Sequence, residues 1–480
     1  MNFNWMSVFT LLACLALPWL RPRAALMLIA VGSFFGSYAI AFEDGLKILP
    51  GPILAAFYCF WLGLAAMWGR RWKVLPFPGS QALRLFIVYA VLLTAIAPLL
   101  FGSRISVIRP GAIADGIREA LPLQFTSSSI AQLAYLVFNV ILLSAAVHAS
   151  RRPGARIGWS LNLHLKIAVI FASAVAIETV LGTVGLPLDF FSWVMGDTFT
   201  ELRPDRYALG DIFGLPIRRA QAVFGEPSFF SVYMTGLFGA ALIQARGKSS
   251  FSNVLRLMLI AFGLLVSFST TAILGLIGVG VLASFVPMDT EPKSGAQART
   301  LRNRRRKFLI ILVVAAIGVI TALATSESLF EYLFGKLTDI SGYDDGNNSS
   351  GAERLFWDLI AGQALVDSFG LGVGAGGTRA SSFILNFGAS FGVPGLLLLV
   401  ALVLLLMRTL YRRAPLPQDR DLRAALIMWI GWFIGLSLSV PDGLSFFYIW
   451  IELGFILALI VPQRISARIL TGHQAARSDG

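Results

Sequence analysis

Thirteen runs of apolar residues, most of them close to 20 residues long, dominate this chain of 480 residues. A membrane-spanning helix needs about 20 such residues, because the hydrocarbon core is about 30 Å thick and offers no water to open backbone groups. Only 14% of the residues are charged, against roughly 25% in soluble domains. The sequence therefore predicts an all-α polytopic membrane protein with about 12–13 transmembrane helices, and it excludes a soluble globular enzyme, a disordered protein and a nucleic-acid-binding module. The runs cover residues 4–20, 24–41, 51–69, 84–102, 128–148, 163–183, 227–245, 253–269, 271–287, 308–325, 380–411 (with a break at Gly392 and Pro394), 423–440 and 444–463.

The first run has two interpretations, a retained helix or a signal peptide. It lacks a basic leading region, and Arg21 and Arg23 follow it instead of preceding it. Signal peptides carry their positive charge in front of the apolar region. We favour the retained helix, with a twelve-helix bundle as the alternative.

The basic residues fall mostly in alternate loops. One set of loops holds 28 of the 39 Lys and Arg residues, and only five of the 26 Asp and Glu residues. The positive-inside rule assigns that set to the cytoplasm, and the basic run 302–307 is expected to contact anionic lipid head groups rather than nucleic acid. Two long segments, 184–226 and 326–380, are then expected on the outer side, where function is predicted to concentrate.

This topology divides the chain into six segments. They are the N-terminal helices 1–183, the first outer segment 184–226, the central helices 227–325, the second outer segment 326–380, the C-terminal helices 381–463 and the cytoplasmic tail 464–480.

The first outer segment ends in Arg218 and Arg219, followed closely by Glu226, Pro227 and Ser228. Proline suits the first turn of a helix, and a carboxylate suits the positive helix start, so one interpretation of Glu226 is a helix cap. Its place at the membrane edge beside two arginines supports a functional role equally well.

The second outer segment contains an amphipathic stretch that begins at Arg354 and then a glycine-rich sequence. Gly372, Gly374 and Gly377 formally satisfy G-x-G-x-x-G, but a dinucleotide site needs a preceding strand, and these residues lie between predicted helices. Two alternatives remain open. The glycines either expose N–H groups that bind phosphate, or simply permit a tight re-entrant turn.

The few histidines and cysteines restrict the chemistry of the outer side. His148, His164 and His473 all fall on the predicted cytoplasmic side, and Cys14 and Cys59 lie within apolar runs. An outer Ser-His-Asp triad or a His-based zinc site is therefore not expected. We expect no metal and no cofactor.

Two acids, Glu178 and Glu452, lie within predicted spans, and we expect both in the outer half of the bundle. A charge in a membrane costs about 3 kcal/mol on insertion scales, so each is a functional hypothesis. A proton-coupled transporter and an enzyme cavity that opens outward would both use such residues, while buried structural pairing is the third possibility.

The chain resembles the superfamily of O-antigen polymerases and O-antigen ligases, bacterial inner-membrane enzymes of glycan assembly. The resemblance covers residues 215–411, whereas residues before it match only in forming a series of spans. It rests on Arg219 followed by Phe224-Gly225-Glu226-Pro227-Ser228, on Arg354 and Trp357 leading to Gly370-Leu371-Gly372-Val373-Gly374, and on Gly392-Val393-Pro394-Gly395.

The resemblance implies a GT-C-like glycosyltransferase architecture in the bacterial cytoplasmic membrane, with the active site facing the periplasm. It implies metal-independent transfer of a glycan from an undecaprenyl-diphosphate-linked oligosaccharide, with membrane lipids and other polysaccharide-assembly proteins as further partners. Ligases of this superfamily usually carry an important outer-loop histidine, which this sequence lacks. We therefore expect a polymerase of O-antigen, capsule or exopolysaccharide, with a ligase as one alternative.

Arginine supplies a permanent, forked donor pair for a diphosphate, and a carboxylate is the remaining base for a sugar hydroxyl. We expect Arg219 and Arg354 to bind the diphosphate and Glu226 to act on the acceptor. Arg218, Arg379, Gly372 and Gly374 are further diphosphate-binding candidates. A lipid-linked oligosaccharide flippase or transporter is the alternative from another class, but two outer loops and the lack of an internal repeat favour the enzyme.

Overall fold

The computed structural model describes residues 5–35, 40–41, 47–68, 79–110, 119–151, 156–183, 208–212, 215–218, 220–247, 250–287, 350–411 and 419–460. Within these ranges the protein is all-α, with thirteen α-helices. Seven of them are long and apolar enough to cross a membrane, and five shorter helices are also apolar. Together these twelve coincide with twelve of the predicted runs, so the prediction of a multi-pass membrane protein is confirmed at this level. The run 308–325 and the basic residues 302–307 lie outside the described residues.

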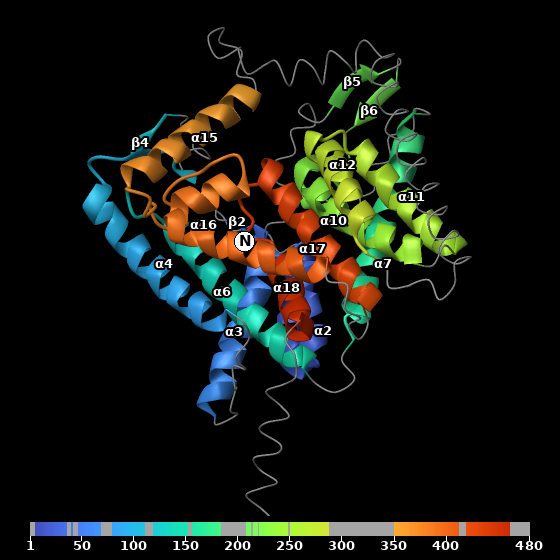
Figure 1. The fold of residues 1–480 in the computed structure, drawn as a ribbon, viewed down its shortest axis with the longest axis horizontal. Coiled ribbons are helices and arrows are strands. Elements are labelled where there is room, and N and C mark those ends of the chain that lie inside the picture. Colours follow the sequence, from blue (N-terminus) through green and yellow to red (C-terminus); the bar gives the residue numbers. More distant parts are fainter. Residues whose placement is uncertain are drawn as a thin grey trace, which may run out of the picture.

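The N-terminal half contributes six helices and the C-terminal half seven (Figure 1). In chain order they are α1 (Trp5–Ala16), α2 (Pro22–Gly32), α3 (Pro50–Met67), α4 (Ser80–Phe101), α6 (Ser127–Ser150), α7 (Gly158–Thr183), α10 (Pro227–Gly247), α11 (Phe251–Val266), α12 (Thr270–Phe285), α15 (Ser350–Asp367), α16 (Phe383–Leu410), α17 (Asp419–Ser439) and α18 (Phe447–Ile460).

Short elements connect these helices. Three antiparallel hairpins join β1 (Ile40–Ala41) to β2 (Lys47–Ile48), β3 (Ser106–Val107) to β4 (Leu121–Pro122), and β5 (Ala208–Ile212) to β6 (Leu215–Arg218). Two 3₁₀ turns, η1 (Leu17–Trp19) and η4 (Ala222–Phe224), precede α2 and α10.

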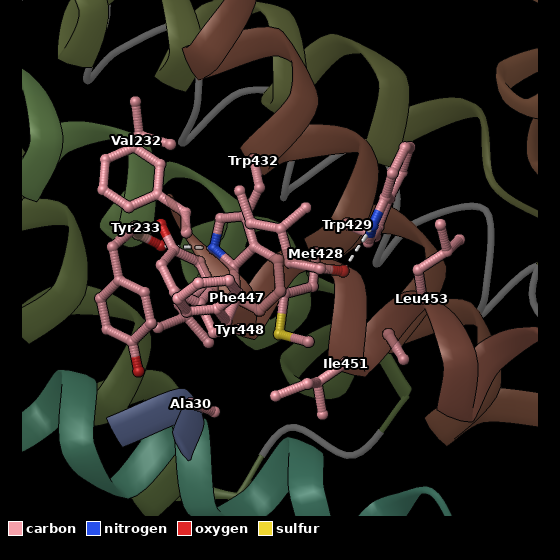
Figure 2. Packing of buried hydrophobic residues seen from close by; sticks show 14 of the residues in the cluster. Ala30, Val232, Tyr233, Met428, Trp429, Trp432, Phe447, Tyr448, Ile451 and Leu453 are labelled. Atoms are coloured by element: carbon pink, nitrogen blue, oxygen red, sulfur yellow. Dashed lines mark hydrogen bonds between the residues drawn. The ribbon is translucent and has the colours of Figure 1, made fainter. Parts of the chain in front are cut away.

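The core is densest where α10 crosses α17. Gly236 and Gly431 let the two backbones approach, since a Cβ on Gly431 would lie 2.8 Å from the Cα of Gly236. Small residues at a crossing are the usual device for close helix packing in membranes. Trp432 closes the crossing by donating its indole N–H to the carbonyl of Tyr233 at 2.9 Å (Figure 2).

Helix α16 carries the predicted break. Its backbone leaves helical geometry at Gly392, where φ is +66°. A side chain there would overlap the carbonyl oxygens of Gly370 and Leu371. Glycine is therefore required at this kink, both by its dihedral angle and by the loop that packs against it.

Candidate functional site

The loop that connects α15 to α16 contains the glycine-rich sequence 370–377 and is called the glycine-rich loop below. Its backbone is left-handed at Phe369, Gly370, Gly372, Gly374 and Gly376. The element before it is helix α15 and not a strand, so the arrangement differs from a dinucleotide-binding unit, as predicted.

The amide hydrogens of this loop already have partners. Gly372 donates to the hydroxyl of Ser368 at 2.9 Å, and Gly374 donates to the carbonyl of Ser390 at 2.9 Å. Both glycines are buried. Amide hydrogens engaged inside the protein fit the alternative of a tight turn. That Gly372 and Gly374 bind the diphosphate stays a prediction.

Helix α4 holds the loop in place from the other side. The N–H of Ala375 donates to the hydroxyl of Thr94 at 2.9 Å, and Tyr89 donates its hydroxyl to the carbonyl of Leu371. A Cβ on Gly374 would lie 2.7 Å from the Cα of Thr94. Since Thr94 lies in the middle of the span α4, the loop enters the bundle.

Arg379 follows this loop and stacks on α15. Its guanidinium carbon lies 5.1 Å from the centroid of the Trp357 ring, within cation–π range. Its Nε is buried without a hydrogen-bond partner among the described residues. Next to it, the carboxylate of Asp358 accepts from the N–H and the hydroxyl of Ser381 at 2.7 and 2.5 Å. These two hydrogen bonds hold the backbone just after Arg379 in place, and they therefore restrict where the guanidinium of Arg379 can lie.

Arg354 lies one turn before Trp357 on α15 and is half-buried. The structure records no ion pair between Arg354 and Asp358, whose two oxygens are used by Ser381. The surface ion pair that would make Arg354 merely structural is therefore not formed with Asp358.

Glu226 occupies the cap position of α10. Its carbonyl accepts the first helical hydrogen bond from Phe230, and its carboxylate accepts from the hydroxyl of Ser228 at 3.0 Å. The side chain is half-buried. The cap interpretation thus has a geometric basis, while a carboxylate held by one hydroxyl keeps lone pairs for a further donor.

The structure groups the predicted residues into two separate places. Arg354, Arg379 and the glycine-rich loop lie together around α15 and the start of α16, whereas Glu226 begins α10 on another side of the bundle (Figure 1). No hydrogen bond or ion pair joins Glu226 to Arg354 or Arg379 in the described part of the chain. Arg219 and the side chain of Arg218 lie outside the described residues.

An apolar cavity of about 260 Å³ lies between α4, α6, α16 and α18. Buried side chains such as Phe86, Leu143 and Leu453 line its depth, and the exposed small residues Ala82 and Ala401 line its rim. Phe387 belongs both to this cavity and to a small polar pocket with Asn386 beside the glycine-rich loop. Phe387 therefore links the apolar cavity to the polar pocket that Ala375 and Gly376 line, three residues before Arg379.

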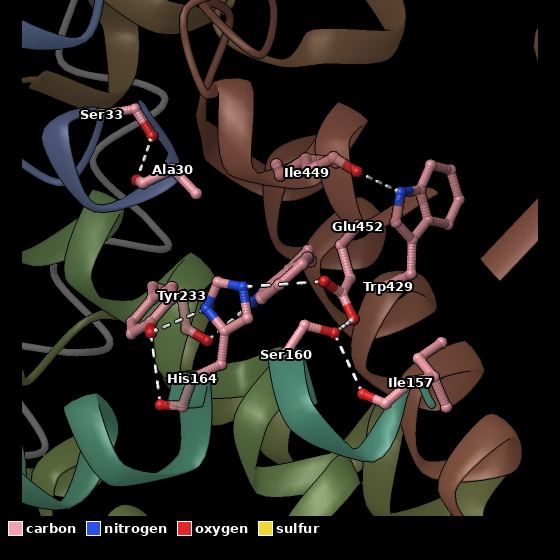
Figure 3. Close-up of polar contacts among 10 residues, drawn as sticks. Ala30, Ser33, Ile157, Ser160, His164, Tyr233, Trp429, Ile449 and Glu452 are labelled. Carbon is pink, nitrogen blue, oxygen red and sulfur yellow. Dashed lines mark hydrogen bonds and ion pairs between the residues drawn. The ribbon is translucent and has the colours of Figure 1, made fainter. Parts of the chain in front are cut away.

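A second polar site surrounds Glu452 (Figure 3). Sequence reasoning singled out Glu452 but missed the side chains around it. The carboxylate accepts from the hydroxyl of Ser160 at 2.9 Å and lies 3.9 Å from Nε2 of His164. Nδ1 of His164 lies 3.2 Å from the hydroxyl of Tyr233 on α10. All four side chains are buried. The i, i+4 spacing of Ser160 and His164 puts both on one face of α7 and was the signal available in the sequence.

One expectation about this site was wrong, and it concerns Glu452. His164 lies near the basic end of its helix, as expected, but α7 begins at Gly158, five residues before the predicted start, so the side chain is buried inside the bundle. Glu452 was expected in the same half as Glu178, yet it lies beside the first turn of α7, while Glu178 lies near the other end of that helix. The reason is that Val440, Leu444 and Phe446 are buried, so α18 begins inside the bundle.

Within the described residues no cluster of three or more His, Cys, Asp or Glu side chains has the arrangement of a metal site. Comparison with known proteins gives no further assignment, since no protein-family profile matches the chain and no curated protein is significantly similar to it.

Proposed function

We propose that this protein transfers a glycan from undecaprenyl diphosphate to a lipid-linked acceptor repeat unit at the periplasmic face of a bacterial inner membrane. It would act as a polymerase for O-antigen, capsule or exopolysaccharide. The observation that carries this proposal is the apolar cavity, which shares Phe387 with a polar pocket beside the glycine-rich loop that precedes Arg379. This pairing matches a substrate with a long apolar tail and an anionic head.

The cavity supports the lipid part of the proposal. Its walls are α4, α6 and α16, three of the candidate membrane spans, together with α18. The rim at Ala82 and Ala401 is exposed on helices whose outer faces carry large apolar side chains nearby, such as Leu85 and Leu404. At that depth the surrounding medium is lipid, so a polyprenyl chain could enter sideways from the bilayer.

Arg379 supports the diphosphate part. A buried guanidinium nitrogen without a partner is costly, and a phosphate oxygen would supply the missing acceptor. Stacking on Trp357 restricts the plane of the fork, which lowers the entropy lost when a phosphate binds. We therefore place Arg379 ahead of Arg354, while Arg219 keeps its role as a proposal from sequence.

The proposed reaction forms one bond and breaks one. The hydroxyl oxygen of the acceptor sugar attacks the anomeric carbon of the donor, and the bond from that carbon to the diphosphate oxygen breaks. The arginines stabilise the leaving diphosphate. Glu226 takes the hydroxyl proton, which requires its carboxylate to lie within hydrogen-bond reach of the attacking hydroxyl, directly or through one water.

A lipid-linked oligosaccharide flippase is the second candidate, and one observation favours it. The buried contact between His164 and Glu452 is of the kind that proton-coupled transporters use. The apolar cavity suits either function.

Polysaccharide from a deletion strain separates the two candidates. Loss of a polymerase leaves single repeat units on lipid at the outer face. Loss of a flippase leaves no repeat units outside, and that result would reject the proposal.

A further inference from the structure

The site around Glu452 is closed at one end and approached by a pocket at the other. Phe34, Phe171 and Phe224 pack on Tyr233, with ring centroids 4.6, 6.3 and 5.3 Å away, and separate the site from the end where Glu226 lies. At the opposite end, a pocket of about 10 Å³ is lined by Ser160 together with Arg23 and Arg156. That volume is about the smallest that holds one water.

Counting hydrogens shows what this site lacks. Ser160 has one hydroxyl hydrogen, but its oxygen lies 2.9 Å from Oε1 of Glu452 and 3.0 Å from the carbonyl of Ile157, which are both acceptors when Glu452 is ionised. If Glu452 carries a proton, it can donate to Ser160 while Ser160 donates to Ile157. Every group in this part of the site is then satisfied.

The other half of the site decides the count, because the carbonyl of Ile157 also accepts from the N–H of Leu161 at 3.2 Å. Nδ1 of His164 and the carbonyl of His164 both lie within reach of the Tyr233 hydroxyl, at 3.2 and 3.4 Å, so a neutral ring can carry its hydrogen on either nitrogen. In both tautomers Nε2 lies 3.9 Å from Oε2 of Glu452, beyond a normal hydrogen bond, and neither atom has a hydrogen-bond partner among the described residues. An ionised carboxylate would thus keep one buried oxygen without a donor, and a proton shared by the pair removes that cost.

The described residues that pack directly on the pair are uncharged, while Arg23 and Arg156 line the pocket on which Ser160 borders. Tyr233 on α10 and Tyr448 on α18 are the titratable neighbours, and both are buried. The neighbouring helices α2 and α17 present Phe34 and Trp432 to His164, with ring centroids 6.1 and 5.3 Å from it. An ionised Glu452 beside a neutral His164 would thus leave one uncompensated buried charge, which is strongly unfavourable.

We propose that His164 and Glu452 together bind one exchangeable proton, which enters through the pocket at Arg156 and Ser160. The proton comes from water in that pocket and passes by way of the Ser160 hydroxyl to the carboxylate or the imidazole. No other bond changes. This site is independent of the glycan-transfer proposal, because it lies beside the first turn of α7 and the aromatic rings separate it from Glu226.

The three histidines of the chain make the site measurable in the full-length protein. Protein labelled with ¹⁵N-histidine in lipid nanodiscs gives three sets of ring signals, and His164→Gln assigns one of them by its loss. Infrared spectra of the same samples report protonated and ionised carboxyl groups. We expect one proton on the pair: either a protonated carboxyl band that is lost in Glu452→Gln, or imidazolium signals of His164 that become neutral in Glu452→Gln. Glu178→Gln is the matched control and should change neither.

A neutral His164 beside an ionised Glu452 throughout the pH range of the folded protein would overturn the proposal. The wild-type spectra decide this even if Glu452→Gln fails to fold. The route is tested by Ser160→Ala, which removes the hydroxyl and should slow exchange of the shared proton with deuterated water at least tenfold. An unchanged exchange rate would reject entry at Ser160.

Discussion

The two polar regions inside this bundle differ in what they leave available. Around His164 and Glu452, protein groups surround the pair, and Oε2 of Glu452 has no hydrogen-bond donor within reach among the described residues. Around the glycine-rich loop, the backbone amides are satisfied by Ser368, Ser390 and Thr94, while Arg379 keeps a nitrogen without a partner. The first region can accept nothing larger than a proton or a water. The second can meet an anionic substrate from outside the protein, so the comparison separates a proton site from a candidate substrate site.

The rigidity of the loop is the feature of the second region that is easiest to break. Gly374→Val puts a β-branched side chain at φ +87°, against the backbone of Thr94. Left-handed strain alone costs about 1–3 kcal/mol, and the overlap adds to it. We expect loss of folded protein and of all activity, measured by thermal unfolding in detergent. Gly362→Ala is the control, because a Cβ there meets nothing within 4 Å, and it should be neutral or stabilising by up to about 1 kcal/mol. Equal stability of the two variants would show that the loop is not held as described.

Removing the charge of Glu226 tests whether this residue of α10 takes part in the reaction that we propose for the region around the glycine-rich loop. As a helix cap the side chain contributes about 1 kcal/mol, whereas a general base contributes about 10²–10⁴-fold in rate. Glu226→Gln should therefore unfold at nearly the wild-type temperature and lose most polymerisation. Normal chain length from well-expressed Glu226→Gln protein would leave only the cap.

Replacing the guanidinium of Arg379 should have the next largest effect on the rate of transfer. Lysine keeps the charge but loses both the bidentate geometry and the planar stacking on Trp357. We expect Arg379→Lys to reduce transfer about 100-fold, the usual cost of one lost donor to a developing anion, with stability close to wild type. Arg408→Lys, at the exposed far end of α16, serves as the matched control. Arg354→Lys is the parallel test of the second arginine; wild-type transfer by both lysine variants would move the diphosphate site to Arg218 and Arg219.

Filling the apolar cavity should give the smallest effect. Ala401→Trp extends into the rim of the cavity, while Leu404→Trp, three residues later on the same helix, lies on an exposed face. We expect the KM for a lipid-linked donor to rise about tenfold in Ala401→Trp, equivalent to 1.4 kcal/mol, and to stay unchanged in Leu404→Trp. A donor with a shortened tail should show no difference between the two variants. The same rise with both donors would mean that the cavity does not hold the tail.

The sequence predicted most of the helices because apolar runs of membrane length have few other uses. It also predicted the break at Gly392, where a glycine and a proline interrupt one run. It could not predict that the amides of Gly372 and Gly374 would be satisfied internally, since Ser390 meets Gly374 only after α16 packs on the loop, and the local contact of Ser368 with Gly372 depends on the conformation of the turn.

The pairing of His164 with Glu452 was hidden for a related reason. The two residues are far apart in the chain, and each helix start differs by a few residues from the apolar pattern. At 1.5 Å per residue these differences, five residues at α7 and three at α18, amount to about 7.5 and 4.5 Å along the helix axes, so the apolar pattern alone did not place the two side chains beside each other.

The most direct test of the central claim is a reconstitution. Purified protein in sealed vesicles is given a polyprenyl-diphosphate-linked repeat unit, and both the length of the glycan and its side of the membrane are measured in excess chelator. The account predicts longer lipid-linked chains, with one polyprenyl diphosphate released for each unit added. Movement of the repeat unit across the membrane without any new glycosidic bond would contradict it.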